Sequence, residues 1–347
     1  RWQVEGSYTG HPALHAAPDR EGVLLLDRAQ PAPASNWHWR VSWWHNGDRQ
    51  TLSPPDLPVF MWGYLSPNGR FLAVNQLEKE NAYPVLLDLT ACDERGCRLQ
   101  PLAGSILWSP GGQRSLILTG SVDHPSFGTL LIADDEGQSI RAEPIPTARD
   151  PFWVDDETFG YLTHNEAGQS VAMLVTGDTA RPLFDPDQLP GTVFTVIPHS
   201  HQPDQYLLQM MERGGVWHLL VYDAATQTVV DNLAQMEDGF LPTSSIAGDY
   251  LLLRHSPAIS APAINRLLVY DMRHEASHFY YLDSDHSWYY YYGLKEAAAG
   301  EWVALLLSRR HMLLTVPRLG YSQLIVHPHL QNCHGLAWVK AAVSTAD

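Results

Sequence analysis

The chain has 347 residues, of which 45% are hydrophobic, so it holds enough apolar material for a large core and is not a disordered chain. Its formal net charge is −16, from 22 Lys and Arg against 38 Asp and Glu, which disfavours nucleic acid and anionic lipid as partners. No apolar run reaches the roughly 18 residues of a membrane-spanning helix, so we expect no insertion into a membrane.

The first 20 residues show no clear hydrophobic period, and we predict an extended arm or linker over residues 1–20. From residue 21 onward, short apolar strands separated by turn residues recur with a spacing of about 40–50 residues. Two Ser-Pro-x-Gly turns, at 66–69 and 109–112, are the clearest anchors of this repeat, because each comes directly before an apolar strand.

The repeat predicts an all-β fold: a seven-bladed β-propeller of four-stranded antiparallel blades, in a single domain over residues 21–347. A propeller of six blades is the alternative. A pair of β-sandwiches is a further alternative, but it would not explain so steady a period. Six blades are predicted to be continuous in the chain, at approximately 58–103, 104–146, 150–186, 192–235, 240–283 and 288–329.

The seventh blade is predicted to be split between the two ends of the chain. Residues 21–53 would supply its second, third and fourth strands, with Asn46-Gly47 as a hairpin turn, and residues 334–343 would supply the first strand, at 335–339. A blade shared by both termini would close the ring and cover strand edges that otherwise invite aggregation. Helical signals are few, and the segment 295–299 is the most helix-friendly.

Cys92 and Cys97 flank a turn-like tetrapeptide between two apolar runs. Facing positions of a hairpin place Cα atoms about 4.5–5.5 Å apart, which suits a disulfide. Such a bridge would imply an oxidising compartment, and the alternative is a pair of free thiols near a turn. Cys333 is left over, and we expect it to be a buried free thiol.

The Ser-Pro-x-Gly turn, with Trp108 on the strand ahead of it, resembles TolB-like and WD-repeat-like β-propellers, and the resemblance extends over residues 22–339. The Gly-His and Trp-Asp signatures of WD repeats are absent, which favours the TolB-like group. Many members of that group are secreted or periplasmic and bind other proteins. The resemblance therefore implies a protein partner and an extracytoplasmic location, by analogy of fold alone.

Aromatic residues are the candidate binding groups. On a predicted strand, Trp288, Tyr290 and Tyr292 share one side, and Tyr and Trp dominate binding hot spots. Tyr83 and Phe127 lie in two of the longest predicted loops, at 77–84 and 120–128. The alternative role of these aromatic residues is packing between blades.

Metal ligands are suggested only by short pairs. His199 with His201, and His327 with His329, have the i, i+2 spacing that places two imidazoles on one side of a strand, but the sequence fixes no third ligand. Asp283 and Asp285 resemble a loose calcium loop, for which a solvated turn is the alternative. We therefore predict neither a metal site nor a cofactor.

Catalytic motifs are missing: the sequence holds no Gly-x-Ser-x-Gly elbow, no His-Glu-x-x-His pair and no phosphate-binding glycine loop. The sequence favours a non-catalytic scaffold that binds a protein, as a domain or subunit of a larger assembly. The alternative is a propeller hydrolase or lyase that acts on a glycan or small ester at the mouth of the channel, since dispersed catalytic groups leave no local motif.

Overall fold

The computed structural model describes the chain in segments, and the following account is confined to them. They are residues 13–16, 23–28, 39–45, 48–52, 59–78, 81–93, 96–120, 128–140, 144–236, 243–247, 249–255, 265–282, 295–299, 302–308, 311–319 and 321–326. Their regular structure consists of β-strands and two single-turn 3₁₀ helices, η1 (Pro186–Gln188) and η3 (Pro317–Leu319). The all-β prediction is confirmed.

The strands form antiparallel sheets whose order follows the chain. The first two sheets are β1 (Ala13–Ala16), β2 (Val23–Arg28), β3 (Trp39–His45) and β4 (Asp48–Thr51), followed by β5 (Val59–Leu65), β6 (Phe71–Glu78), β7 (Asn81–Asp93) and β8 (Gly96–Pro101). A seven-stranded sheet comes next, with β9 (Ser105–Trp108), β10 (Arg114–Thr119), β11 (Gly128–Asp134), β12 (Ile145–Trp153), β13 (Thr158–His164), β14 (Ser170–Thr176) and β15 (Thr179–Pro182).

Three further four-stranded sheets complete the described chain. They are β16 (Gly191–Pro198), β17 (Gln205–Glu212), β18 (Trp217–Asp223) and β19 (Thr228–Met236); then β20 (Thr243–Ala247), β21 (Tyr250–His255), β22 (Asn265–Asp271) and β23 (Ala276–Leu282); and last β24 (Lys295–Ala299), β25 (Trp302–Ser308), β26 (His311–Val316) and β27 (Tyr321–Val326).

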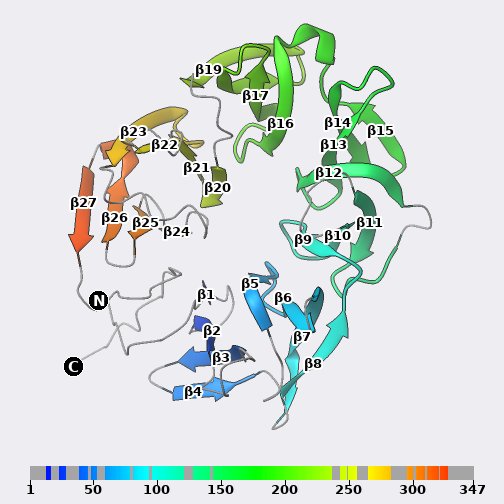
Figure 1. The fold of residues 1–347 in the computed structure, drawn as a ribbon, viewed down its shortest axis with the longest axis vertical. Helices are drawn as coiled ribbons and strands as arrows, with labels where there is room; N and C mark the ends of the chain where they lie inside the picture. The colour runs from blue at the N-terminus through cyan, green and yellow to red at the C-terminus, as the bar shows by residue number, and fades with distance from the viewer. Residues whose placement is uncertain are drawn as a thin grey trace.

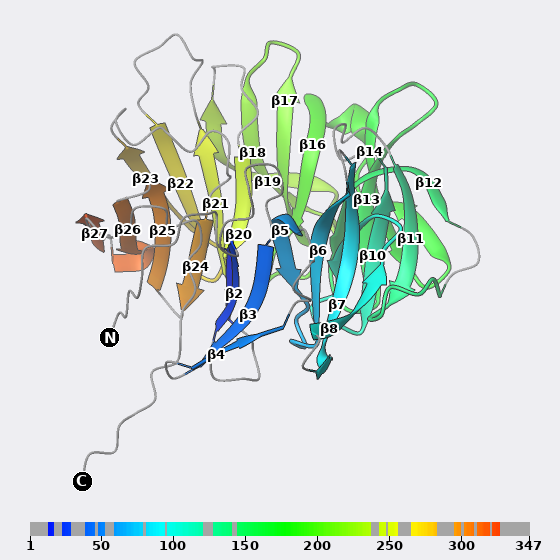
Figure 2. The ribbon, with the colours of Figure 1, turned by 60° about the horizontal axis from the view of Figure 1, so that its bottom comes forward.

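The sheets follow one another around a common centre in chain order (Figure 1). The first strand of a sheet, such as β5, β16 or β20, lies toward the centre, and the last, such as β4 or β27, lies on the outside. The turned view shows the strands standing upright around that centre (Figure 2). Within the described segments, no helix is long and apolar enough to cross a membrane.

The core lies between neighbouring sheets, which explains why the middle strands are apolar on both faces. In β17, Leu207 points to the β20–β23 sheet and packs with Leu251, while Leu208 points to the seven-stranded sheet and packs with Leu174. Alternate residues of one strand therefore belong to different interfaces.

Strand β12 differs from the sequence prediction. A separate fourth strand was expected before residue 146 and a new first strand after residue 150. Instead, β12 is continuous: Ile145 and Ala148 pair with β11, and the segment from Arg149 to Trp153 pairs with β13. The register shifts between Arg149 and Phe152, where Asp150 has a φ of 42°. This bulge bends the strand, which allows it to leave one neighbour and join the next.

The predicted partner of β2 is also corrected. Strand β1 lies inside the segment predicted to be an arm, and it pairs with β2 from Ala13↔Leu26 to Ala16↔Val23. It takes the position that the split blade assigned to residues 335–339, which lie outside the described residues. A strand only a short loop away reaches that edge with a smaller loss of chain entropy than one from the far terminus.

The helix-friendly segment at 295–299 is a strand, β24, which pairs with β25 from Lys295↔Leu306 to Ala299↔Trp302. Local propensity favours a helix for its alanines, but five residues are too few for a stable helix and pairing with an apolar neighbour prevails. The inner strand of this sheet is therefore β24, and not the aromatic run at 288–292, which lies outside the described residues.

Candidate functional site

Exposed apolar side chains gather on the outer strands of consecutive sheets. Phe279 on β23 is 51% exposed, Leu319 in η3 is 65% exposed and Tyr321 on β27 is 44% exposed. Leu319 and Tyr321 lie two positions apart in the chain, in η3 and at the start of β27, and this pair is called here the outer apolar patch. The neighbouring strand β23 contacts η3, and it carries the exposed Phe279. Figure 1 shows β23 and β27 on the outer side of the molecule.

Hydrogen bonds of Thr315 to Tyr321 and Tyr280 stabilise the backbone next to the outer apolar patch. Thr315 donates its hydroxyl proton to the carbonyl oxygen of Tyr321 over 2.7 Å, and its Oγ1 lies 2.6 Å from the phenol oxygen of Tyr280. Because the Thr315 proton is already used, Tyr280 is the donor in the second bond. Tyr280 therefore points inward, and Phe279, its neighbour on the strand, points to the other side.

The next sheet adds two exposed valines on its own outer strand. In β19, Tyr222 pairs with Val229 and Val221 pairs with Asp231, so Val230 is an extra residue without an opposite neighbour. This bulge leaves Val229 and Val230 exposed, at 42% and 52%. Most of the large, exposed apolar residues among the described ones thus lie on outer strands.

The inner strands β12 and β16 carry a different arrangement, built on two bulges. The Arg149 guanidinium carbon lies 5.8 Å from the centre of the Phe194 ring, and that ring lies 4.9 Å from the Trp217 ring. Arg149 Nη2 also donates to Ser170 Oγ over 2.9 Å and to the Val193 carbonyl oxygen over 3.2 Å. These contacts join the seven-stranded sheet to its neighbour.

Asp150 lies beside this stack. Asp150 is exposed, but desolvation by the surrounding protein atoms raises the pKa of its carboxyl, an effect that the Arg149 charge partly offsets. The sequence offers no local motif for this group, because the bulges that bring Arg149, Asp150 and Phe194 together form only when two strands pair.

The predicted binding aromatics are mostly beyond the described segments. Trp288, Tyr290, Tyr292 and Phe127 all lie outside them. Tyr83 lies within β7, opposite Gln76 on β6, and so belongs to a strand and not to the predicted loop. Of this set, Tyr83 is the residue that the structure describes.

His199 and His201, at the β16–β17 turn, each contact other parts of the protein. His199 is buried, and its Nδ1 accepts the backbone N–H groups of His201 and Gln202. His201 Nε2 lies 3.0 Å from Asp249 Oδ1, and Asp249 Oδ2 lies 2.8 Å from Arg273 Nη2. Burial lowers the pKa of His199, which favours the neutral imidazole. This network ties the β16–β17 turn to the following sheet.

One nitrogen of each imidazole has another partner, namely His199 Nδ1 and His201 Nε2. The described residues contain no group of three or more His, Cys, Asp or Glu placed to hold an ion. The other weak candidates, His327, His329, Asp283 and Asp285, lie outside the described segments.

The two Ser-Pro-x-Gly turns have matching geometry. Gly69 and Gly112 adopt φ values of 69° and 68°, and each donates its N–H to the serine carbonyl oxygen that begins the turn. The Asn68 amide donates to the Gly112 carbonyl oxygen over 3.1 Å, so the turns of adjacent sheets touch. Sequence reasoning recognised these turns but missed their contact, which depends on how the sheets are placed.

Arg70 follows the first of these turns and extends the contact between sheets. It forms ion pairs with Asp88 of its own sheet at 3.4 Å, and with Asp135 and Glu136 of the next sheet at 3.6 and 2.9 Å. The acidic turn at 134–137 is therefore a structural partner of Arg70.

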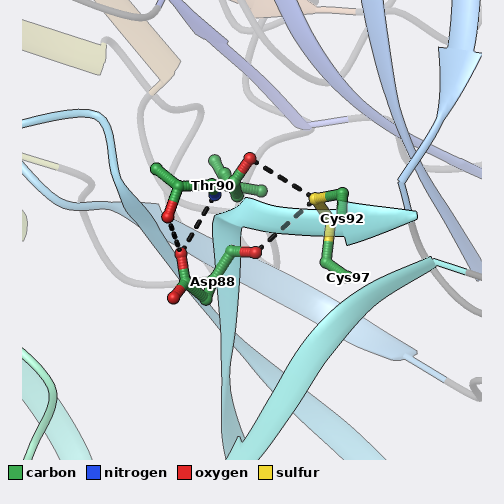
Figure 3. Close-up of a disulfide and its surroundings, with 5 residues drawn as sticks. Asp88, Thr90, Cys92 and Cys97 are labelled. Atoms are coloured by element: carbon green, nitrogen blue, oxygen red, sulfur yellow. Dashed lines mark hydrogen bonds between the residues drawn. A yellow bond between two sulfur atoms is a disulfide. The ribbon is translucent and has the colours of Figure 1, made fainter.

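The structure joins Cys92 and Cys97 by a disulfide, at opposite positions of the β7–β8 hairpin (Figure 3). Beside it, Asp88 Oδ1 accepts hydrogen bonds from the backbone N–H and the hydroxyl of Thr90. Burial by itself would raise the pKa of Asp88, but the bonds from Thr90 and Arg70 outweigh it and lower that pKa.

Comparison with protein-family models and with curated proteins gives no match. Solved structures do match, as β-propellers. The β-propeller domain of the Trilobed protease from Pyrococcus furiosus is 12% identical, with a TM-score of 0.55, and the match covers 94% of this chain and 98% of that one. Sqt1 from Saccharomyces cerevisiae is 10% identical, with a TM-score of 0.55, over 92% of this chain and 87% of that one.

Acylaminoacyl peptidase from Pyrococcus horikoshii is 12% identical, with a TM-score of 0.54, over 91% of this chain. The chain spans only 52% of the length of that peptidase. At these identities the likeness shows the fold alone, which is a β-propeller.

Proposed function

We propose that this β-propeller is a non-catalytic interaction module that binds a protein, as a domain or subunit of a larger assembly. The observation that carries the proposal is the outer apolar patch of Leu319 and Tyr321, with the exposed Phe279 on the neighbouring strand β23. Soluble proteins rarely expose neighbouring large apolar side chains without a use for them, and such patches are typical of protein interfaces. On β19, the outer strand of the preceding sheet, Val229 and Val230 are exposed apolar side chains as well.

The solved structures with a similar fold support the proposal that this chain is a domain or subunit of a larger assembly. The chain covers 98% of the propeller domain of the Trilobed protease but 52% of the acylaminoacyl peptidase, so a propeller of this kind accompanies further domains in those proteins. The proposal is that this chain also works together with further domains or subunits.

The proposed architecture is a single domain of seven blades. Strand β12 pairs with β11 through Ile145 and Ala148 and with β13 from Arg149 onward, so the seven-stranded sheet divides into two units of four strands that share β12. Together with the five four-stranded sheets, this makes 5 + 2 = 7 blades. The domain would then begin at β1 and not at residue 21.

The proposed location is extracytoplasmic. The support is the Cys92–Cys97 disulfide, since disulfides persist mainly in oxidising compartments. The predicted aromatic contacts, Trp288, Tyr290, Tyr292, Tyr83 and Phe127, remain a second proposed set of binding residues beside the outer apolar patch.

The test is affinity capture with three forms of the full chain as bait. The first is the wild type, the second is Leu319→Ser with Tyr321→Ser, and the third is Ser322→Ala, a matched change at an exposed position of β27. We expect the wild type and Ser322→Ala to retain one stoichiometric protein, and the double variant to lose it while keeping the same melting temperature.

Equal retention by all three baits would show that the outer apolar patch is not the interface. Failure of the wild type to retain any protein, together with turnover of p-nitrophenyl esters or glycosides, would contradict the scaffold and favour the hydrolase. Both measurements use the same purified chain.

A further inference from the structure

The tip of the β7–β8 hairpin stands apart from its sheet. Strand β6 pairs with β7 only as far as Asp88, so residues 90–93 of β7 have no β6 neighbour. The β7–β8 ladder is also interrupted, because Asp88 pairs with Arg98 and the next pair is Cys92 with Cys97. The segment of residues 90–93 and 96–97, called here the hairpin tip, is thus separated from the rest of the ladder by a bulge in β7, and the disulfide joins its two arms.

The hairpin tip holds the chain that arrives from the first sheet. The Cys97 backbone N–H donates to the Leu52 carbonyl oxygen over 2.6 Å, and Leu52 comes directly after β4. Leu52 and Cys97 are both buried, and they share one apolar cluster with Leu72, Leu87 and Leu89 of the second sheet. The tip therefore connects the β1–β4 sheet to the β5–β8 sheet.

The atoms around Cys92 accommodate both the disulfide and the reduced thiol. Cys92 Sγ lies 3.5 Å from the Asp88 carbonyl oxygen and 3.4 Å from the Leu89 carbonyl oxygen (Figure 3). A disulfide sulfur has no proton to donate, but a Cys92 thiol would find two acceptors already in place. Cys92 is half-buried and Cys97 is buried, so an external thiolate reaches Cys92 first.

We infer that the Cys92–Cys97 disulfide is a redox-sensitive clip, which holds the β1–β4 sheet against the β5–β8 sheet when oxidised and releases it when reduced by a dithiol. The thiolate of the dithiol attacks Cys92 Sγ, and the sulfur–sulfur bond breaks with its electron pair on Cys97, which takes up a proton. The second thiol of the dithiol then attacks the mixed disulfide, so that Cys92 leaves as a thiol and the dithiol becomes a cyclic disulfide.

Release has a defined structural consequence. Without the cross-link, the two arms of the hairpin tip are joined only by the turn and by a ladder with a three-residue gap. The Cys97 N–H then loses its fixed position opposite Leu52, and the apolar cluster opens at its edge. The inference does not depend on the proposed function.

The test is hydrogen exchange of the full chain, oxidised and after incubation with dithiothreitol. We expect the peptides that cover residues 48–52 and 96–100 to exchange about tenfold faster after reduction, because the tip opens locally. The peptide that covers residues 105–119, where Gly112 donates to Ser109, serves as an internal reference and should not change.

Two variants separate the clip from other thiol effects. The double change Cys92→Ser and Cys97→Ser should exchange like the reduced wild type at all times, and Cys333→Ser should behave like the wild type in both states. Unchanged exchange at 48–52 and 96–100 after complete reduction would overturn the inference. Faster exchange throughout the chain would overturn it as well, because the disulfide would then stabilise the whole domain and not one junction.

Discussion

His199 shows how a single buried side chain can make stability depend on pH. Its Nδ1 accepts two backbone N–H groups, and burial lowers its pKa below the ordinary value of about 6.5. The unfolded chain therefore binds a proton more readily than the folded one below that value. It follows that stability is fully present above pH 6.5 and is lost as the pH falls below it.

The change His199→Asn tests this dependence. An Asn Oδ1 can accept the same backbone N–H groups, but it does not titrate. We expect the wild type to lose more stability than the variant between pH 7.5 and pH 5, by an amount on the order of 1 kcal/mol, in urea titrations at both values. Parallel loss in the two proteins would assign the acid sensitivity to other groups.

Tyr270 makes stability depend on pH in the alkaline range. Its side chain is 2% exposed, and burial, helped by the nearby acidic side chains of Glu275, Asp231 and Asp271, raises the pKa of its phenol to about 12. The folded state holds the phenolic proton more tightly than the unfolded state, whose pKa is about 10. Stability is therefore fully present below pH 10 and is lost as the pH rises toward 12.

Replacement of this residue by phenylalanine, Tyr270→Phe, removes the ionisable group and keeps the ring. We expect the wild type to lose about 1.5–2 kcal/mol relative to the variant between pH 9.5 and pH 11.5. Tyr321→Phe, at an exposed position, is the control and should follow the wild type. The measurement is the unfolding midpoint in urea, and an identical alkaline slope for Tyr270→Phe would refute the assignment.

Among the elements, the two Ser-Pro-x-Gly turns offer a matched comparison. Ser66 Oγ accepts the Phe71 N–H over 2.8 Å and donates to Asn68 over 2.7 Å, whereas Ser109 Oγ accepts the Arg114 N–H over 3.3 Å. Both serines are buried. We expect Ser66→Ala to cost about 1–2 kcal/mol and Ser109→Ala less than about 1 kcal/mol, since the shorter bonds contribute more.

The two alanine variants are compared by urea denaturation under identical conditions. Their turns share the same backbone hydrogen bond from glycine to serine, so the difference isolates the side-chain bonds. A larger loss for Ser109→Ala than for Ser66→Ala would contradict the ranking by distance.

Elements defined by local signals were the ones that the sequence predicted well. The strands after the two turns, β6 and β10, lie where the apolar runs are, because a fixed proline φ and a glycine with positive φ impose the reversal locally. Strand β24 was missed, since its alanine-rich sequence favours a helix and only pairing with β25 makes it extended.

For the whole molecule, the net charge of −16 is the dominant electrostatic feature. Mutual repulsion among carboxylates opposes the compact state, and salt screens it. We expect the melting temperature to rise by about 1–2 °C between 20 mM and 200 mM NaCl, which corresponds to roughly 1 kcal/mol. KCl and CaCl₂ at matched ionic strength should give the same rise. A much larger rise with CaCl₂ alone would indicate a bound cation instead.

Like the fold, the candidate site has features that could be predicted from the sequence and features that could not. The disulfide pair could be predicted from its spacing, because a hairpin places facing residues together by local geometry alone. The outer apolar patch could not, since the exposure of Leu319 and Tyr321 depends on how the neighbouring sheet packs beside η3. The Arg149–Phe194 stack was missed for the same reason.

The sequence by itself determined the class of fold, the repeat of strands and the turns between them, because hydrophobic alternation and turn chemistry act over a few residues. Only the tertiary structure decided that β1 pairs with β2, that β12 serves two neighbours, and which turns meet between sheets. The contact between the turns joins residues far apart in the chain, and the strand pairings are choices among competing neighbours. Several strands of similar pattern could fill each position, and the balance of packing and loop-closure entropy selects among them.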